Sequence, residues 1–330
     1  MKDLGQLSAD QFIEGIRAGD TVIIARAITL LESSIESHKI KAADVLKKCL
    51  PYAGNSIRIG ISGAPGVGKS TFIEAIGNFI LEKNKKLAVL AVDPSSKKSK
   101  GSVLGDKTRM QELAKKKNVF IRPTASGEKM GGVASATRET IILLEAAGYE
   151  IILVETVGVG QNETAVYDIT DIFILLLIAG AGDELQGIKR GIMEMADIIA
   201  INKSDGENIA NAKIAKADAE RAIHFFHPKD SGWQTTVDTI SSLTGDGVEK
   251  IWQRIIEHHS AAEKNGWLQQ NRKQQFKLWF YDNLNNALLT HFTKDKNYKK
   301  LLSDYENKIA EGKILPTAAV EELLKLMFRH

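Results

Sequence analysis

The sequence contains a single cysteine, no apolar run long enough for a membrane span and almost no net charge. Cys49 cannot form an internal disulfide, and the apolar spacing around it indicates a packed thiol in a reducing compartment, so we expect a cytoplasmic protein. The most apolar stretch, 172–181, is too short to cross a bilayer, and the N-terminus lacks a signal-peptide pattern. Lys and Arg total 44 against 41 Asp and Glu, and this net charge of +3 creates no field that would attract nucleic acid or a membrane.

Three regions of different pattern follow one another along the 330 residues. Residues 1–52 are expected to form a small helical region, because Ser8 and Gln11 have capping-box spacing and apolar residues recur at helical spacing behind them. Residues 53–262 alternate short β-branched runs with amphipathic helices, which is typical of an α/β domain with a doubly wound, mostly parallel sheet. The expected strands are 57–62, 87–93, 119–122, 151–155, 172–179, 198–202 and 236–241.

Residues 263–330 are again expected to be helical, as a C-terminal arm. Their apolar side chains fall on two stripes at helical spacing. The stripes consist of Phe276, Phe280, Leu284, Leu288 and Phe292, and of Val320, Leu323, Leu324, Met327 and Phe328. Both stripes need a surface that buries them. That surface is either the α/β domain or a second copy of the chain, and the pattern alone favours neither.

A glycine-rich loop, GAPGVGKS, lies between the first expected strand and an amphipathic helix. It has the GxxxxGK[ST] form of the P-loop, which wraps phosphate groups with backbone N–H donors at a helix N-terminus. Lys69 is expected to bridge the β- and γ-phosphates, and the Ser70 hydroxyl to ligate Mg²⁺. The expected phosphate-binding residues are Gly63, Ala64, Pro65, Gly66, Val67, Gly68, Lys69, Ser70 and Thr71.

Carboxylates at the ends of neighbouring strands are the oxygen ligands that Mg²⁺ prefers. Asp93 ends one expected strand, Asp106 lies in the loop beyond it, and Glu155 ends another. Glu155 and Gly158 stand in the places of the acid and the glycine of the DxxG element, which senses the γ-phosphate. The expected catalytic residues are Lys69, Asp93 and Glu155, and the expected metal ligands are Ser70, Asp93, Asp106 and Glu155.

The sequence NKSD at 202–205 follows another apolar strand and has the form of an NKxD base-recognition element. A carboxylate at Asp205 accepts two hydrogen bonds from guanine, from N1–H and the exocyclic amine, whereas adenine offers no such donor pair. The element therefore predicts GTP and GDP rather than ATP as ligands. The stem of Lys203 is expected to cover the base, and Asn202 to tie this loop to the P-loop. Backbone N–H groups at Ser241, Ser242 and Leu243 are expected to face the guanine O6.

Longer strings extend beyond these general elements. They are VDPSS (92–96), LGDKTRM (104–110), GGVASATRET (131–140), ETVGVGQNE (155–163) and GDELQGIKRGIMEMAD (182–197). Together they resemble the G-protein chaperones of methylmalonyl-CoA mutase, the MeaB/ArgK type to which the human methylmalonic aciduria type A protein is similar. The resemblance covers nearly the whole chain, and these strings are far more specific than a P-loop.

The resemblance implies GTP hydrolysis that is coupled to loading adenosylcobalamin onto an acyl-CoA mutase and to protecting that enzyme from inactivation. It also implies a homodimer formed through the C-terminal helices, and it suggests a cobalamin adenosyltransferase as a further partner. By position, Asp93, Asp106 and Glu155 match the Mg²⁺ and switch acids of the family. Asp183, Gln186 and Lys189 match a mobile segment that relays nucleotide state to the mutase. An ordinary helix capped by Asp183 explains the same segment, and both interpretations can hold.

No motif identifies the residue that orients the attacking water. Val159 follows Gly158 at the position where Ras-like GTPases have a glutamine, so we expect slow intrinsic hydrolysis that a partner accelerates. Gln161 lies close by and is a candidate for the same task, although the polarity of a loop explains it equally well.

Three other functions compete with this interpretation. A GTPase that delivers a metal such as nickel normally shows a His- or Cys-rich tract, and this chain has one Cys and seven scattered His. A P-loop kinase or transport ATPase is disfavoured by the NKSD element. A binding protein with a vestigial P-loop is disfavoured because Lys69, Ser70 and Glu155 are all present.

Overall fold

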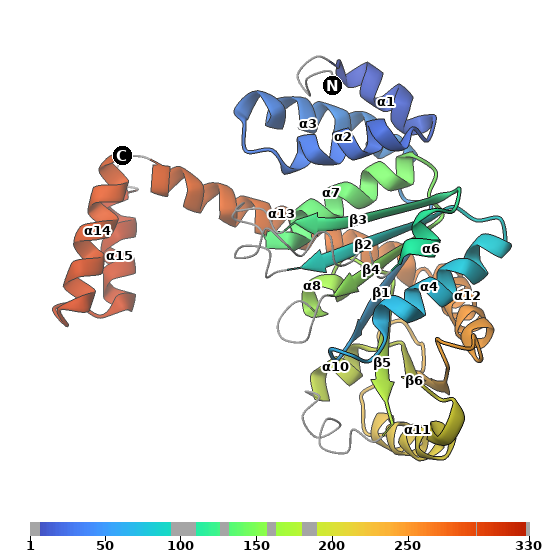
Figure 1. Cartoon of the computed structure of the whole chain (residues 1–330). Coiled ribbons are helices and arrows are strands. Elements are labelled where there is room, and N and C mark those ends of the chain that lie inside the picture. Colours follow the sequence, from blue (N-terminus) through green and yellow to red (C-terminus); the bar gives the residue numbers. More distant parts are fainter. Residues whose placement is uncertain are drawn as a thin grey trace. The chain divides into compact units, whose positions relative to one another are not determined.

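The computed structural model describes residues 7–93, 110–125, 132–156, 163–179, 190–294 and 296–327. Its central feature is a seven-stranded sheet in the order β3-β2-β4-β1-β5-β6-β7, in which every pair of neighbours is parallel (Figure 1). The strands are β1 (Ile57–Gly63), β2 (Leu87–Asp93), β3 (Val119–Ala125), β4 (Ile151–Thr156), β5 (Ile172–Ile178), β6 (Ile198–Asn202) and β7 (Thr236–Thr239). The predicted α/β fold with a doubly wound, mostly parallel sheet is therefore confirmed.

The two faces of the sheet are filled by different helices, because side chains alternate along each strand. On one face, Ile61 of β1 belongs to a buried apolar cluster with Phe72 of α4 and Ile255 of α12. On the other face, a Cβ added to Gly60 would lie 2.8 Å from the ring of Phe173, so the close approach there requires glycine. The helices of this domain are α4 (Lys69–Glu82), α6 (Gln111–Ala114), α7 (Gly132–Ala146), α8 (Glu163–Tyr167), α10 (Arg190–Met195), α11 (Ile209–Ile223) and α12 (Val248–Lys264).

From residue 7 onward, where the description begins, the N-terminal region forms three helices that pack on one another and on α7 (Figure 1). Its first helix begins as predicted, since Ser8 and Gln11 exchange both bonds of a capping box. Arg122 of β3 also fastens this region to the sheet, with Nη2 2.6 Å from Oε2 of Glu32. The helices are α1 (Ala9–Arg17), α2 (Thr21–Glu32) and α3 (Glu36–Cys49), followed by a short 3₁₀ turn at Leu50–Tyr52.

The chain divides into two compact units, Met1–Gln275 and Phe276–His330. The division falls within the long helix α13 (Trp267–Lys294), whose first turns belong to the larger unit. The functional boundaries expected near residues 52 and 262 stay a prediction. Among the described residues, no helix combines the length and apolarity that a bilayer crossing requires.

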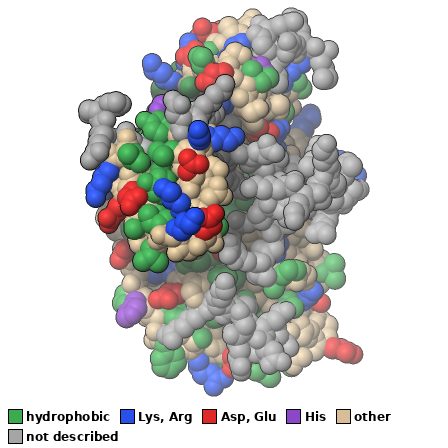
Figure 2. Space-filling view, turned by 90° about the vertical axis from the view of Figure 1, so that its left-hand side faces the viewer, with side chains coloured by type: hydrophobic (Ala, Val, Ile, Leu, Met, Phe, Trp, Pro, Cys, Tyr) green, Lys and Arg blue, Asp and Glu red, His purple; other side chains and the backbone are tan. Residues whose placement is uncertain are grey.

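The C-terminal unit contains α14 (Lys296–Ala310) and α15 (Pro316–Met327), which pack against each other. The buried Tyr305 of α14 donates a hydrogen bond to Glu322 of α15 at 2.9 Å. Figure 2 shows hydrophobic side chains gathered in this part of the chain, among charged ones. Six described side chains of the two predicted apolar stripes are exposed: Phe276, Phe280, Leu284, Leu288, Val320 and Leu324. The side chains of Phe292, Met327 and Phe328 lie outside the described residues.

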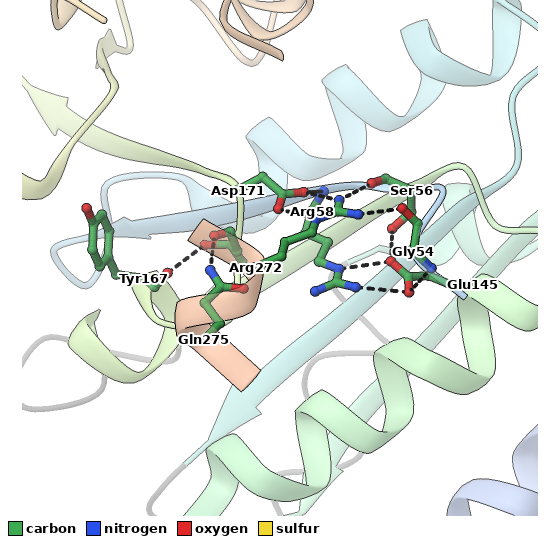
Figure 3. A network of polar contacts seen from close by, with 9 residues as sticks. Gly54, Ser56, Arg58, Glu145, Tyr167, Asp171, Arg272 and Gln275 are labelled. Carbon is green, nitrogen blue, oxygen red and sulfur yellow. Dashed lines mark hydrogen bonds and ion pairs between the residues drawn. The ribbon is translucent and has the colours of Figure 1, made fainter. Parts of the chain in front are cut away.

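Four charged side chains of alternating sign anchor the start of α13 (Figure 3). Arg272 binds both oxygens of Asp171, and Arg58 binds both oxygens of Glu145 at 2.8 and 3.0 Å. The backbone N–H of Arg58 also donates to Asp171 at 2.9 Å. Arg272 lies on α13, Arg58 on β1 and Glu145 on α7, and Asp171 immediately precedes β5, so the network ties these four elements together. Each charge has an opposite partner, which offsets the loss of water around buried ions.

Candidate functional site

The glycine-rich loop joins β1 to α4 and is closed by its own lysine. The Nζ of the buried Lys69 donates to the carbonyl oxygens of Gly63 at 2.7 Å and Ala64 at 3.3 Å. A buried ammonium group requires such acceptors. Phosphate oxygens are acceptors of the same kind, so an anion enclosed by the loop could take over these hydrogen bonds.

Close approach between the loop and the end of β6 requires glycine at position 68. Gly68 has φ of 98°, in the left-handed region, and a Cβ added there would lie 2.6 Å from Nδ2 of Asn202. That same Nδ2 donates to the carbonyl of Val67 at 2.8 Å. The backbone of the loop therefore rests directly on the side chain of Asn202.

Asn202 connects the loop to a third segment as well. Its Oδ1 accepts from the backbone N–H of Ser242 at 3.1 Å and from the Ser242 hydroxyl at 2.8 Å. The asparagine is 1% exposed and ends β6, so one buried amide holds together the glycine-rich loop, the end of β6 and the segment after β7. The predicted tie between the NKSD segment and the loop is present in the structure.

A hydroxyl and a carboxylate face each other at the start of α4. The Ser70 Oγ lies 3.4 Å from Oε1 of Glu155, which is 5% exposed near the end of β4. Glu155 pairs with Ile61 in the sheet, and Ile61 belongs to the cluster on the α4 side. Glu155 therefore points toward α4, where these two oxygens form a donor set of the kind that Mg²⁺ prefers.

A second polar pair lies beyond β6. The Ser241 Oγ is 2.5 Å from Oδ2 of Asp205, and the same Oγ accepts from the backbone N–H of Thr244 at 3.1 Å. The Ser241 hydroxyl therefore donates its proton to the carboxylate while its oxygen accepts from Thr244. Lys203 has φ of 59°, a left-handed conformation that turns the chain sharply between Asn202 and Asp205.

The structure places most of the predicted site residues at one edge of the sheet, where the carboxyl ends of β1, β4 and β6 lie. Asp93 ends the neighbouring β2, although its side chain is outside the described residues. Leu243, in the segment after β7, is 81% exposed. The predicted residues that lie outside the description are Asp106, Gly158, Gln161, Asp183, Gln186 and Lys189.

Two buried hydroxyl residues beside this edge were not predicted. Ser62 and Thr156 are fully buried and hydrogen-bonded to each other at 3.0 Å. Neither stands at a fixed position of the motifs, and only the pairing of β1 with β4 brings them together. No pattern in the sequence could have revealed that pairing.

Comparison with known proteins gives a match over most of the chain. A sequence model of the family described as "Methylmalonyl Co-A mutase-associated GTPase MeaB" matches residues 24–297. The chain belongs to this family. The resemblance stated from the sequence strings is thereby confirmed, and as a member of the MeaB family the chain is a GTPase that binds guanine nucleotide.

Relatives of similar length support the assignment to the MeaB family. The "GTPase ArgK" of Escherichia coli is 41% identical over 320 residues, which cover 97% of each protein. The mouse "Methylmalonic aciduria type A homolog, mitochondrial" is 40% identical over 335 residues, covering 98% of this chain and 81% of that protein. Among solved structures, a "LAO/AO transport system kinase" is 36% identical, with a TM-score of 0.78 and 97% of each chain covered.

Proposed function

We propose that this chain is a GTP-hydrolysing chaperone that assists the loading of adenosylcobalamin onto methylmalonyl-CoA mutase, or a related acyl-CoA mutase, and protects that enzyme. The observation that carries the proposal is the convergence of Lys69, Ser70, Glu155 and Asn202 at one sheet edge in a member of the mutase-associated GTPase family. In parallel α/β sheets ligands bind at this carboxyl edge.

The nucleotide is proposed to lie along this edge, with its phosphates in the loop 63–71 and its base at 202–205. Lys69 would exchange its carbonyl partners for β- and γ-phosphate oxygens, since both are good acceptors for an ammonium group. Asp205 would accept from N1–H and the amine of guanine while Ser241 holds the carboxylate in place. Ser242 and Leu243 would offer backbone N–H groups toward O6, and the stem of Lys203 would cover the base.

Mg²⁺ is proposed to be held by Ser70, Asp93, Asp106 and Glu155. The 3.4 Å separation of the Ser70 hydroxyl and the Glu155 carboxylate supports this set, because both are hard oxygen donors at the N-terminal end of α4, next to the glycine-rich loop. The ion would neutralise charge that develops on the phosphates. Within the chain, Lys69, Asp93 and Glu155 are the proposed catalytic residues, with Lys69 contributing the positive charge nearest the transferred group.

Hydrolysis by the isolated chain is proposed to be slow, because Val159 follows Gly158 where a water-orienting glutamine would stand. Gln161 is a candidate substitute. Asp183, Gln186 and Lys189 are proposed to relay the nucleotide state to the mutase. Faster hydrolysis would then occur only in complex with the client enzyme.

The assembly is proposed to be a homodimer that works in the cytoplasm. Exposed apolar side chains of the C-terminal unit, such as Phe280 at 61% and Val320 at 54%, would be covered by a second copy. The single cysteine, Cys49, is buried and suits a reducing compartment. The proposed functional regions are 1–52, 53–262 and 263–330, and a cobalamin adenosyltransferase is proposed as a second partner.

Single-turnover GTP hydrolysis, measured with and without a candidate adenosylcobalamin-dependent mutase, tests this function. We expect slow hydrolysis by the chain alone and at least about a tenfold increase with the correct mutase. The matched control is Lys69→Ala, which should show no increase at the same mutase concentration. Fast hydrolysis by the isolated chain would contradict the partner-gated mechanism. Absence of stimulation by every cobalamin mutase tried would instead favour a metal-delivery GTPase.

A further inference from the structure

A pair of buried hydroxyl groups joins the strand that leads into the glycine-rich loop to the strand that carries Glu155. The Thr156 Oγ1 donates to the Ser62 Oγ at 3.0 Å, and the carbonyl of Ile61 lies 3.5 Å from the same Oγ1. Both hydroxyl residues are 0% exposed. A buried hydroxyl that lacks a partner destabilises a protein. The Ser62 hydroxyl has Thr156 as its partner, whereas Thr156 has the more distant carbonyl of Ile61 as a second acceptor.

The hydroxyl bond lies where the backbone ladder between β1 and β4 ends. The register of this pair runs from Ile57 opposite Ile151 to Ile61 opposite Glu155. The next residue on each strand is Ser62 and Thr156, and the contact between these two is made by side chains instead. From this point β1 continues beside β5, with Ser62 opposite Leu175. The hydroxyl pair therefore extends the connection between the two strands by one residue toward the site.

Functional groups of the site flank this pair on both strands. Gly63 follows Ser62, and its carbonyl accepts a hydrogen bond from Lys69. Glu155 precedes Thr156 and faces Ser70 at 3.4 Å. Because side chains alternate along a strand, the hydroxyls of Ser62 and Thr156 point to the face opposite Glu155. They do not reach the site themselves and act on it through the backbone.

We propose that the Ser62–Thr156 hydroxyl bond is a positioning contact that holds Glu155 at the correct separation from Ser70 for binding a divalent cation. This inference rests on the proposed roles of Ser70 and Glu155 as Mg²⁺ ligands. Mg²⁺ demands near-ideal octahedral geometry, so a small drift between β1 and β4 lowers its affinity. Nucleotide held by the loop amides and by Asp205 is less affected, because those groups lie in the loop between β1 and α4 and in the segment after β6 rather than on β4.

The test uses the full-length chain and two substitutions that remove one hydroxyl each with little change of shape. Thr156→Val keeps the branched side chain, and Ser62→Ala removes a single atom. The measured quantities are the Mg²⁺ concentration for half-maximal retention of a fluorescent GDP analogue and the affinity for that analogue in EDTA. Loss of one hydrogen bond predicts about a threefold to tenfold rise in the half-maximal Mg²⁺ concentration, with the affinity in EDTA unchanged.

Two further variants separate positioning from general loosening. Thr156→Ser retains the hydroxyl and should behave like the wild type. The half-maximal Mg²⁺ concentration of the double variant should not exceed that of the single variant with the weaker Mg²⁺ binding, because both substitutions break the same contact. If Thr156→Val fails to fold, Ser62→Ala alone tests the proposal, because removing one oxygen atom leaves only a small cavity.

The outcomes distinguish this inference from the proposed metal site. If wild-type retention of the analogue does not depend on Mg²⁺, the proposed metal site is wrong, and the positioning inference that rests on it is wrong as well. If the wild type depends on Mg²⁺ and both single variants match it, the positioning inference alone is wrong. An equal loss of affinity with and without Mg²⁺ would also overturn it, because that result indicates a merely structural contact.

Discussion

Arg272 binds both carboxylate oxygens of Asp171, with Nε 2.9 Å from Oδ1 and Nη2 2.6 Å from Oδ2. Its Nη2 also donates to the carbonyl of Ser56, and Gln275, one turn later, donates to the carbonyl of Thr170 at 2.7 Å. These contacts fasten the first turns of α13 to the ends of β1 and β5 that lie away from the candidate site. The compact unit ends at Gln275, the last of these contacts along the helix.

Replacing Arg272 by Gln should destabilise the larger unit by about 3–5 kcal/mol, because it leaves the buried Asp171 charge without its ion-pair partner. Urea unfolding followed by circular dichroism measures the change. The matched control is Lys273→Gln, which removes an exposed positive charge from the next position of the same helix and should alter stability by less than about 0.5 kcal/mol. Equal stability of the two variants would contradict an anchoring role.

Stability should fall on acidification through the titration of Asp171. Burial raises the pKa of this carboxyl, but the hydrogen bonds from Arg272 and the charges of Arg272 and Arg58 outweigh burial and hold the pKa below its ordinary value. The folded state therefore binds fewer protons than the unfolded state. The resulting stabilisation is complete above about pH 4, the unfolded pKa, and is lost as the pH falls through the lower folded pKa.

Unfolding midpoints measured between about pH 2.5 and pH 7 test this dependence. Asp171→Asn should be less stable at neutral pH and should lose less stability on acidification, because the titrating group is gone. A wild-type and an Asp171→Asn profile that run parallel through the acid range would show that the carboxyl does not contribute.

Asp205→Asn should weaken GTP binding by about a hundredfold and relax the base preference toward xanthine nucleotides, because an amide cannot accept from both guanine donors. Ser241→Ala should have a smaller effect in the same direction, since it removes the hydroxyl that orients the carboxylate. Titration with fluorescent guanine and xanthine nucleotides measures both. Ser204→Ala is the control, because the backbone bond from Ser204 to Ile240 is retained. Unaltered GTP affinity in Asp205→Asn would refute the base site.

Gly68→Ala and Gly66→Ala form a matched pair within the loop. Both positions have left-handed φ values, 98° and 80°, which destabilise a residue other than glycine by about 1–2 kcal/mol. At position 66 nothing lies within 4 Å of an added Cβ, whereas at position 68 the Cβ would meet Asn202 at 2.6 Å. Gly68→Ala should therefore displace Asn202 and lower GDP affinity by about tenfold more than Gly66→Ala, as measured by equilibrium titration. Similar affinities would show that Asn202 moves aside freely.

The strands were predicted well because their sequence pattern is strong. Seven apolar, β-branched runs correspond to β1 through β7, and the differences lie at the ends. The strand expected at 119–122 extends to Ala125, and the one expected at 236–241 stops at Thr239. These ends depend on ladder partners: Pro123 to Ala125 of β3 lie beside Ala91 to Asp93 of β2, which side-chain periodicity does not report.

The motif residues could also be predicted from local sequence. Local spacing predicted the loop at 63–70 and the NKSD segment, because each is a continuous string whose chemistry demands particular residue types. The motif led us to expect that Asn202 contacts the P-loop, and the structure shows this contact as a 2.8 Å hydrogen bond to the carbonyl of Val67. The roles of these residues in nucleotide binding stay predictions that the experiments above address.

The sequence by itself determined the parallel α/β fold, the kind of ligand loop and membership of the MeaB family, since each is written in short continuous patterns. Only the tertiary structure decided which residues meet across the sheet. Ser62 and Thr156 form a hydrogen bond although 94 positions separate them in the sequence. Arg272 and Ser56 also form one, across 216 positions. Such contacts depend on the strand order β4-β1-β5, which is set by packing of the whole domain rather than by any local pattern.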